Sequence, residues 1–573
     1  MRTAMACRSR TGPRSRCNNL PPVTPEALAQ AIRQCVADLV AVGTVSIAVP
    51  EQVQVERPRS RDHGDYATNV AMTLAKGAGM PPAALAELIC QALTDVPGIQ
   101  GAEVAGPGFI NIRLDSAAAG EVARQAVEQG AAYGRGDSQA GQVVNLEFIS
   151  ANPTGPLHLG HTRWAAVGDA IARVLTASGA QVTTEFYIND RGVQMDKFGA
   201  SVLAVAQGEP IPEDGYRGGY IVDLAAEVVA DDPDLLNLPE GQRMPAFREA
   251  AYRRQLRQQQ HVLELFRTHF EVWASERALH ESQAVEHGFE VLRAHGHVYQ
   301  SEGALWLRTT DFGDDKDRVL VKADGEYTYF ASDTAYYVNK RERGFDRCIY
   351  LLGADHHGYV QRLRAVAACH GDEMDTVEVL IGQLVKITRG GEEVKLSKRA
   401  GTIVTLEELV EEVGVDAARY WLIRYPVDSP LTLDLEVIVQ RTNDNPVFYV
   451  QYAHARICSV LRNAADLGID WRQATFEPGL LVEERETELL GSLAAFPRIV
   501  ASAAELREPH RIARYLEELA TDYHRFYDTC RVLPRSDESL SQTQVARLWL
   551  CAGARQVIAN GLDLLGVSAP ERM

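Results

Sequence analysis

The sequence lacks any apolar run that approaches the ~20 residues a membrane-spanning helix requires, so we expect no association with a membrane. Its nine cysteines form no Cys-x-x-Cys pair, and their odd number does not suit a scaffold in which every cysteine is paired. Zinc ribbons and secreted disulfide-stabilised folds are therefore disfavoured, and we expect no zinc. Cysteines used in this way indicate a reducing compartment, and we expect the protein in the cytoplasm.

Positive charge is also scarce. The chain has 58 lysines and arginines against 77 aspartates and glutamates, a net charge of −19, and residues 445–573 contain no lysine at all. This balance excludes a generally basic nucleic-acid-binding coat, although a local basic face remains compatible with it. With 46% hydrophobic and 24% charged residues, the composition is otherwise typical of a globular protein. A length of 573 residues predicts about three or four domains.

The first residues lack acidic side chains. No aspartate or glutamate precedes Glu26, whereas five arginines lie within the first 16 residues. An Arg-rich, acid-poor leader resembles an organellar transit peptide, and translation from upstream of the true start explains it equally well. We expect residues 1–23 to be a disordered, dispensable leader.

Residues 24–115 have the pattern of a small α+β domain. Apolar residues recur at helical spacing over 25–40 and 81–94, whereas 45–55 alternates as a strand does. Residues 104–114 also have a strand pattern, which Gly106 and Gly108 break.

Residues 116–444 have the pattern of a parallel α/β domain. A strand at 143–150, a helix at 157–178 and a strand at 181–188 form a βαβ unit, and such crossovers build parallel sheets. A charge-rich helical insertion is expected at about 195–311. Further strands are predicted at 304–308, 318–322, 347–352 and 377–387, and residues 445–573 are predicted to be almost wholly helical.

One loop lies between the first strand and the helix of this unit. It consists of Ala151, Asn152, Pro153, Thr154, Gly155, Pro156, Leu157, His158, Leu159, Gly160 and His161. Backbone N–H groups at such a helix start bind phosphate, and Gly160 leaves the backbone open between two histidines on one helical face. A capped turn with two surface histidines is the alternative, whereas a metal site is disfavoured because no third ligand follows.

A second, basic segment covers residues 394–402. Lys395 and Lys398 flank Ser397 in a short loop that suits a polyphosphate, and alone the segment is equally compatible with a solvated charge cluster. Thr405 and Glu408 then predict a capping box for a helix over 406–412.

Together, the His-x-Gly-His and Lys-Leu-Ser-Lys-Arg segments resemble the HIGH and KMSKS signatures of class I aminoacyl-tRNA synthetases. The wider sequence resembles the arginyl-tRNA synthetases over about residues 24–573. The matching stretches are 62–69, 106–111, 147–158, 187–190, 328–333, 353–359, 415–420 and 445–456. Many arginyl enzymes have a degenerate second signature, whereas here only Leu396 and Arg399 depart from the usual form.

This resemblance implies an α/β fold class with three domains. A small α+β N-terminal domain that contacts tRNA is expected at 24–115, a Rossmann-like catalytic domain with HIGH and KMSKS-type loops at 116–444, and an all-helical anticodon-binding domain at 445–573. The implied reaction activates L-arginine with ATP to arginyl-adenylate and pyrophosphate, and then transfers arginine to the terminal ribose of tRNA(Arg). Mg²⁺ is expected on the ATP phosphates, and the protein is expected to be a monomer.

The resemblance also implies roles for individual residues. Catalysis falls to His158, His161, Lys395 and Lys398. ATP binding falls to His158, Gly160, His161, Asp355, His356, Lys395, Ser397 and Lys398, and arginine binding to Glu147, Ser150, Asn152, Tyr329 and Asp333. In this scheme Asp333 and Tyr329 meet the guanidinium group, although Asp333 alone is also compatible with a helix N-cap.

The C-terminal third supplies arginines interleaved with aromatic residues, a combination that suits unpaired RNA bases. The aromatic residues are Tyr449, Tyr452, Tyr523, Phe526 and Tyr527. Solvated arginines and core aromatics are the alternative reading of this pattern. Two rival functions remain at this stage: a small-molecule nucleotidyltransferase with the same histidine chemistry, and an RNA-binding relative without activity.

Overall fold

The computed structural model describes residues 23–573 except 59, 394–404 and 536–537. Residues 1–22 of the expected leader, and the loop that carries Lys395, Ser397 and Lys398, lie outside the described residues. The chain divides into two compact units. The first comprises residues 1–133, 457–495 and 522–556, and the second comprises residues 134–456, 496–521 and 557–573.

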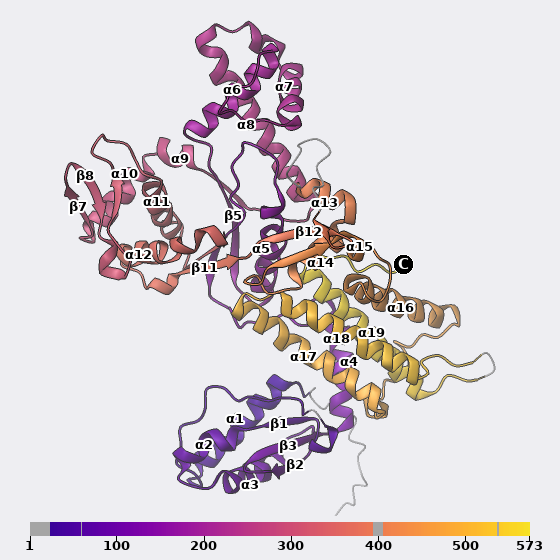
Figure 1. Cartoon of the computed structure of the whole chain (residues 1–573). Coiled ribbons are helices and arrows are strands. Elements are labelled where there is room, and N and C mark those ends of the chain that lie inside the picture. Colours follow the sequence, from indigo (N-terminus) through magenta and orange to yellow (C-terminus); the bar gives the residue numbers. More distant parts are fainter. Residues whose placement is uncertain (1–22, 59, 394–404, 536–537) are drawn as a thin grey trace, which may run out of the picture. The chain divides into compact units, whose positions relative to one another are not determined.

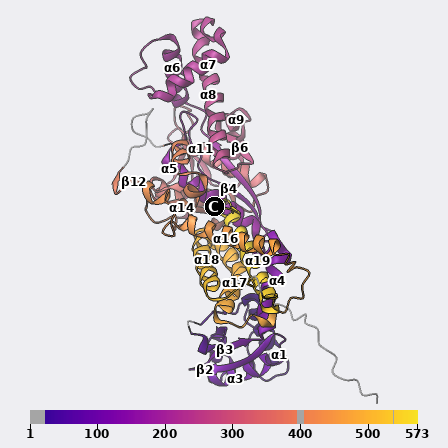
Figure 2. The ribbon, with the colours of Figure 1, turned by 90° about the vertical axis from the view of Figure 1, so that its right-hand side faces the viewer.

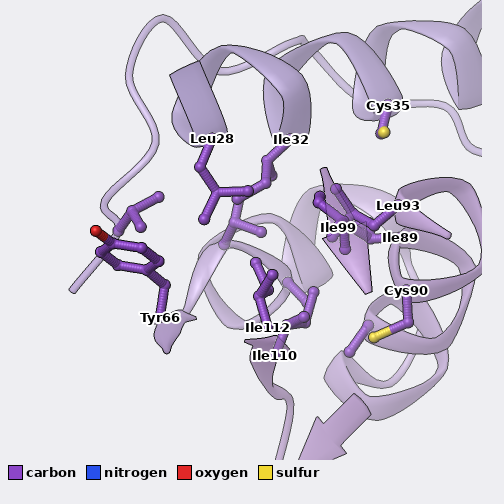
Figure 3. Packing of buried hydrophobic residues seen from close by; sticks show 14 of the residues in the cluster. Leu28, Ile32, Cys35, Tyr66, Ile89, Cys90, Leu93, Ile99, Ile110 and Ile112 are labelled. Carbon is purple, nitrogen blue, oxygen red and sulfur yellow. The ribbon is translucent and has the colours of Figure 1, made fainter. Parts of the chain in front are cut away.

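The first unit contains the predicted α+β module. A three-stranded antiparallel sheet has the order β1-β3-β2, with β1 at Tyr66–Thr68, β2 at Ile99–Ala105 and β3 at Phe109–Leu114. Helices α1 (Pro25–Ala41), α2 (Val70–Ala78) and α3 (Pro82–Leu93) supply most of its apolar core. Figure 3 shows Leu28 and Ile32 of α1 above Ile110 and Ile112 of β3. The two predicted helices are therefore confirmed.

One strand prediction in this module is wrong. Residues 45–55 form no strand, although Val45 and Val55 are buried, and the pairing begins only at Glu56 with Ala67. Alternating burial of an extended segment thus imitates a strand that makes no ladder. The break predicted within 104–114 is confirmed, because Gly106 and Gly108 adopt positive φ and turn the chain between β2 and β3.

The second unit is built on a five-stranded parallel sheet of order β11-β10-β4-β5-β6. Its strands are β4 (Val143–Glu147), β5 (Gln181–Ile188), β6 (Val272–Ser275), β10 (Arg347–Gly353) and β11 (Val377–Gly382). Helix α5 (Leu159–Ala177) connects β4 to the parallel strand β5, which confirms the predicted βαβ unit. Helices α11 (Tyr329–Glu342) and α12 (Val360–His370) flank β10 in sequence.

The expected insertion at 195–311 is only partly helical. Helices α6 (Val193–Gln207), α7 (Gly219–Asp231) and α8 (Glu240–Leu265) lie side by side in Figure 1 and in the turned view of Figure 2. The same range then contains β6, which is an edge strand of the main sheet and too short to give a sequence signal. After it come α9 (Glu276–Glu281), α10 (Ala284–Ala294), β7 (Val298–Ser301), β8 (Ala304–Leu307) and, beyond the range, β9 (Arg318–Val321).

The region after β11 forms a second small sheet. Its strands are β12 (Val385–Arg389), β13 (Glu392–Glu393) and β14 (Leu431–Asp434), so the single strand predicted at 377–387 is split between two sheets. Helix α13 (Leu406–Val413) begins with the predicted capping box of Thr405 and Glu408. Helices α14 (Val415–Ile423) and α15 (Leu435–Ile438) complete this region.

The predicted helical C-terminal region is confirmed. It contains α16 (Pro446–Asp466), α17 (Glu484–Leu506), α18 (His510–Thr529) and α19 (Gln542–Leu564). Tyr523 and Phe526 have no exposed surface, so these two rings are core residues and are not available to stack on RNA bases. Among the described residues, α17 has the length and apolar character to cross a membrane, but buried core helices share these properties.

Candidate active site

A cavity of about 1030 Å³ opens at the carboxyl ends of the parallel strands of the second unit. It is bounded by Glu147 at the end of β4, Gly353 at the end of β10 and Gly382 at the end of β11. Ligands bind to open α/β sheets at this edge. Nine of the residues expected in the site line the cavity: Glu147, Ser150, His158, Gly160, His161, Tyr329, Asp333, Asp355 and His356.

The two histidines form the N-terminal cap of α5. The backbone N–H of Gly160 donates to Nδ1 of His158 at 3.1 Å, and the backbone N–H of His158 donates to Nδ1 of His161 at 3.3 Å. Their rings lie 3.9 Å apart between centroids. Because each Nδ1 accepts a hydrogen bond, the proton of each neutral ring resides on Nε2. The two histidines therefore cap α5, as the alternative interpretation of the sequence proposed, and they also line the cavity.

Both imidazoles are neutral at physiological pH. Burial lowers the pKa of His158, and burial together with the neighbouring His158 lowers the pKa of His161 to about 3. The positive end of the α5 dipole lies at the same place. This end of the cavity therefore offers N–H donors and a favourable dipole to an anion, without a fixed positive charge of its own.

The far end of the second signature segment is attached to the histidine turn. Thr405, the first described residue after the segment, forms an antiparallel bridge with His158, and the N–H of Leu406 donates to the carbonyl of Leu157 at 2.8 Å. From Lys398 to Thr405 is seven residues, a reach of at most ~25 Å for an extended chain.

Arg163, near the start of α5, connects this helix to the chain around the second small sheet. Its guanidinium is almost wholly buried and donates to backbone carbonyls of Ser429 at 2.8 Å and Pro426 at 2.7 Å. It also reaches the carbonyl of Gln383, between β11 and β12, at 3.4 Å. The first turns of α5 are thereby tied to the sheet that leads into and out of residues 394–404.

Asp333 also lines the cavity. Helix α11 begins at Tyr329 with Thr328 as its N-cap, so the alternative of Asp333 as N-cap is wrong and the carboxylate lies in the second turn. The hydroxyl of Tyr359 donates to Asp333 at 2.5 Å. Burial raises the pKa of Asp333 to about 7, and Glu147 and Glu276 add to the effect. The site thus holds a carboxyl whose charged form a nearby cation would favour.

Glu147 is already paired, by a lysine that sequence reasoning missed. Lys340 has no exposed surface, and its ammonium lies 2.5 Å from the Glu147 carboxylate and above the rings of Tyr336 and Tyr350. The hydroxyl of Ser150 donates to the same carboxylate at 3.2 Å. The available signal was the helical spacing of Asp333, Tyr336 and Lys340, which places all three on one face of α11.

Four further expected residues are exposed. Asn152 is exposed and does not line the cavity, and its backbone carbonyl accepts a hydrogen bond from Gln259. Tyr329 lines the cavity but is 81% exposed. Asp355 and His356 follow β10, 3.4 Å apart between carboxylate and imidazole, with Asp355 largely exposed. Over the described residues, no group of three or more His, Cys, Asp or Glu could hold a metal ion.

Three family models match the chain. Residues 26–114 match "Arginyl tRNA synthetase N terminal domain", residues 123–211 and 248–424 match "tRNA synthetases class I (R), catalytic domain", and residues 450–573 match "DALR anticodon binding domain". The break at 211–248 falls within the α6–α8 region.

Curated relatives match along almost the whole chain. An arginine–tRNA ligase of Kineococcus radiotolerans is 54% identical over 96% of this chain and all of its own length. One of Frankia alni is 55% identical over the same shares. Solved structures with the same fold include Thermus thermophilus arginyl-tRNA synthetase, 23% identical, with a TM-score of 0.74 over 96% of this chain and all of that one. Plasmodium falciparum arginyl-tRNA synthetase, 15% identical, gives 0.70 over 96% and 99%.

The rival assignment to a small-molecule nucleotidyltransferase is not compatible with these matches, because they continue through both the N-terminal and the helical C-terminal regions. With relatives more than half identical over their whole length, the chain belongs to the arginyl-tRNA synthetase family, the class I arginine–tRNA ligases.

Proposed function

We propose that the cavity at the ends of β4, β10 and β11 is where this chain joins arginine to ATP and then passes arginine to tRNA(Arg). The observation that carries the proposal is the polarity of this one cavity. Neutral N–H donors and a helix N-terminus line it, and so does the partly buried carboxyl of Asp333. An amino acid with a cationic end and a nucleotide with an anionic end fit this arrangement.

At the anionic end, His158 and His161 donate from Nε2 to the α-phosphate and the adjoining ribose. Activation is an in-line displacement at phosphorus, in which charge develops on oxygen atoms that fixed donors stabilise. Lys395 and Lys398, with Ser397, hold the β- and γ-phosphates of the departing pyrophosphate. The link between Thr405 and His158 supports this, since it anchors one end of the lysine loop at the histidine turn. ATP enters with Mg²⁺ held chiefly by its own phosphates and water.

At the cationic end, Asp333 pairs with the guanidinium of arginine. A guanidinium is planar and permanently charged, and a carboxylate can accept two of its N–H groups in parallel. Tyr329 closes over this group from the rim. Glu147, Ser150 and Asn152 serve the α-amino end, where Ser150 already fixes the Glu147 carboxylate. Lysine would leave an acceptor unpaired, so discrimination requires no editing site.

Asp355 and His356 bind the ribose or adenine, because they follow β10 at the edge where nucleotides bind to such sheets. The N-terminal module and the helical C-terminal region contact the tRNA. For this second contact, the exposed arginines of α18, such as Arg511, Arg514 and Arg525, are better placed than its buried aromatics. We further propose that the protein acts as a monomer in the cytoplasm.

The test is ATP–pyrophosphate exchange driven by arginine, measured with and without tRNA(Arg), together with aminoacylation. We expect exchange with arginine and none with lysine. If another amino acid drives exchange and is attached to tRNA while arginine is not, the proposed function is wrong.

A further inference from the structure

The backbone between β4 and the signature loop is strained. Ile149 and Ser150, which directly follow β4, have φ values of 70° and 47°, and both line the cavity. A β-branched residue such as isoleucine rarely adopts the left-handed region, and such a conformation persists only where the surrounding structure enforces it. These two residues directly precede the loop that leads to His158 and His161.

Two side chains from the α7–α8 region hold the next part of the loop. The Nε2 amide of Gln259 in α8 donates to the carbonyls of Asn152 at 3.0 Å and Gly155 at 2.8 Å. The hydroxyl of Tyr220 in α7 donates to the carbonyl of Thr154 at 3.1 Å. Three backbone carbonyls within four residues of the loop thus accept hydrogen bonds from side chains of α7 and α8, which lie much later in the sequence.

Burial makes these hydrogen bonds consequential. Gln259 is only 1% exposed, and loss of its amide would leave two loop carbonyls without this donor. Neither Gln259 nor Tyr220 lines the cavity. Their contacts end at Gly155, three residues before His158, the N-cap residue of α5.

We propose that Gln259 and Tyr220 are positioning residues, through which the α7–α8 region holds the strained loop and sets the two histidines for adenylate formation. The inference rests on the proposed function, in which those histidines contact the phosphate. The proposal gives α7 and α8 a role in adenylate formation, although both helices lie far from the signature loop in the sequence.

The main experiment compares Gln259→Leu with Gln255→Leu in single-turnover formation of arginyl-adenylate. Gln255 lies one helical turn earlier, is equally buried, and donates within α8 to Gln258 at 3.2 Å. We expect Gln259→Leu to lower the rate constant by about ten- to a hundredfold, with KM for arginine within about twofold. Gln255→Leu should leave both nearly unchanged. An equal effect of the two variants would overturn the proposal.

A milder variant covers the case in which Gln259→Leu does not fold. Tyr220→Phe removes one hydroxyl and should slow adenylate formation by about two- to tenfold, with KM for arginine and the melting temperature nearly unchanged. A loss that appears in KM alone, or no loss at all, would contradict the assigned role.

A double-mutant cycle tells positioning from general damage. If Gln259 acts through the histidine turn, Gln259→Leu should have little further effect on the rate in a His158→Ala background. Independent, multiplicative losses would overturn the proposal. Wild-type protein that shows no exchange with arginine would instead refute the proposed function, so the two failures are distinguishable.

Discussion

At Asp333 a carboxyl lies in the interior, beside a tyrosine hydroxyl and with no ion-pair partner among the described residues. The neighbouring Glu147 has its own cation, Lys340, and does not compete for one. A bound guanidinium would therefore neutralise the charge of Asp333 without displacing an existing ion-pair partner. We infer that the proposed specificity for arginine follows from this difference between two nearby carboxylates.

The affinity for arginine should depend on pH through Asp333. Burial raises the pKa of this group to about 7 in the empty site, and the guanidinium favours the charged form, so binding releases a proton below that pH. Affinity should fall as pH drops below about 7 and level off above about 8. Calorimetry in buffers of different ionisation enthalpy would count the proton, and a pH-independent affinity would contradict the assignment.

Asp333→Asn should remove this dependence and weaken arginine binding by about 2–5 kcal/mol, the usual cost of removing one partner from a buried charge pair. The binding constant for ATP should change little. Equilibrium titration with each ligand separately checks both expectations, and equal loss of both affinities would place Asp333 outside the arginine pocket.

Lys340→Met should destabilise the fold, because it leaves Glu147 buried without its cation. We expect a loss of about 3–5 kcal/mol in the free energy of unfolding of the catalytic unit. In the double variant with Glu147→Gln most of this loss should disappear, as no uncompensated charge remains. Urea unfolding of the three variants would measure the cycle, and additive losses would show that the two side chains do not interact.

The elements that could be predicted are those whose hydrophobic periodicity and cap residues lie within their own segment of the sequence. The βαβ unit, the capping box of α13 and the helical C-terminal region follow from periodicity and cap residues, which are properties of neighbours in sequence. The turn that carries the two histidines was also predictable, and both histidines line the cavity. Strand β6 and the split between β11 and β12 were not, because pairing partners far along the chain decide them. Lys340 and Gln259 were missed for the same reason, since their partners lie in other elements.

Arg163 connects α5 to the loop before β14, and its replacement should reduce catalysis more than tRNA binding. Arg163→Met would leave the carbonyls of Pro426 and Ser429 without this donor and free the first turn of α5 from the second small sheet. We expect at least about a tenfold fall in the rate of adenylate formation, with tRNA affinity unchanged. Arg173→Met, on the same helix but paired with Asp169, is the matched control. A similar fall in the control would contradict a role specific to Arg163.

Over the whole molecule, the two signature segments lie far apart in the sequence. The histidines and the lysine loop are separated in the sequence by the α6–α8 region and most of the parallel sheet, yet Thr405 and His158 are bridged. The net charge of −19 is no obstacle to a polyanionic partner, because association depends on local patches rather than on the sum.

At this scale Lys398→Ala should separate catalysis from RNA binding. The loss of one donor to the transition state should lower adenylate formation by about 10²–10³-fold. The affinity for tRNA should remain nearly intact, because the proposed RNA contacts lie in the N-terminal module and the C-terminal helices. Equal losses of both would contradict the role of the loop.

The central claim is that one cavity holds the guanidinium at Asp333 and the phosphate at His158 and His161. A crystal structure with a non-hydrolysable arginyl-adenylate analogue tests it most directly. The account predicts a two-pronged contact between the guanidinium and Asp333, with the phosphate within hydrogen-bonding distance of both Nε2 atoms. An analogue bound with its guanidinium away from Asp333, or with its phosphate away from both histidines, would contradict it.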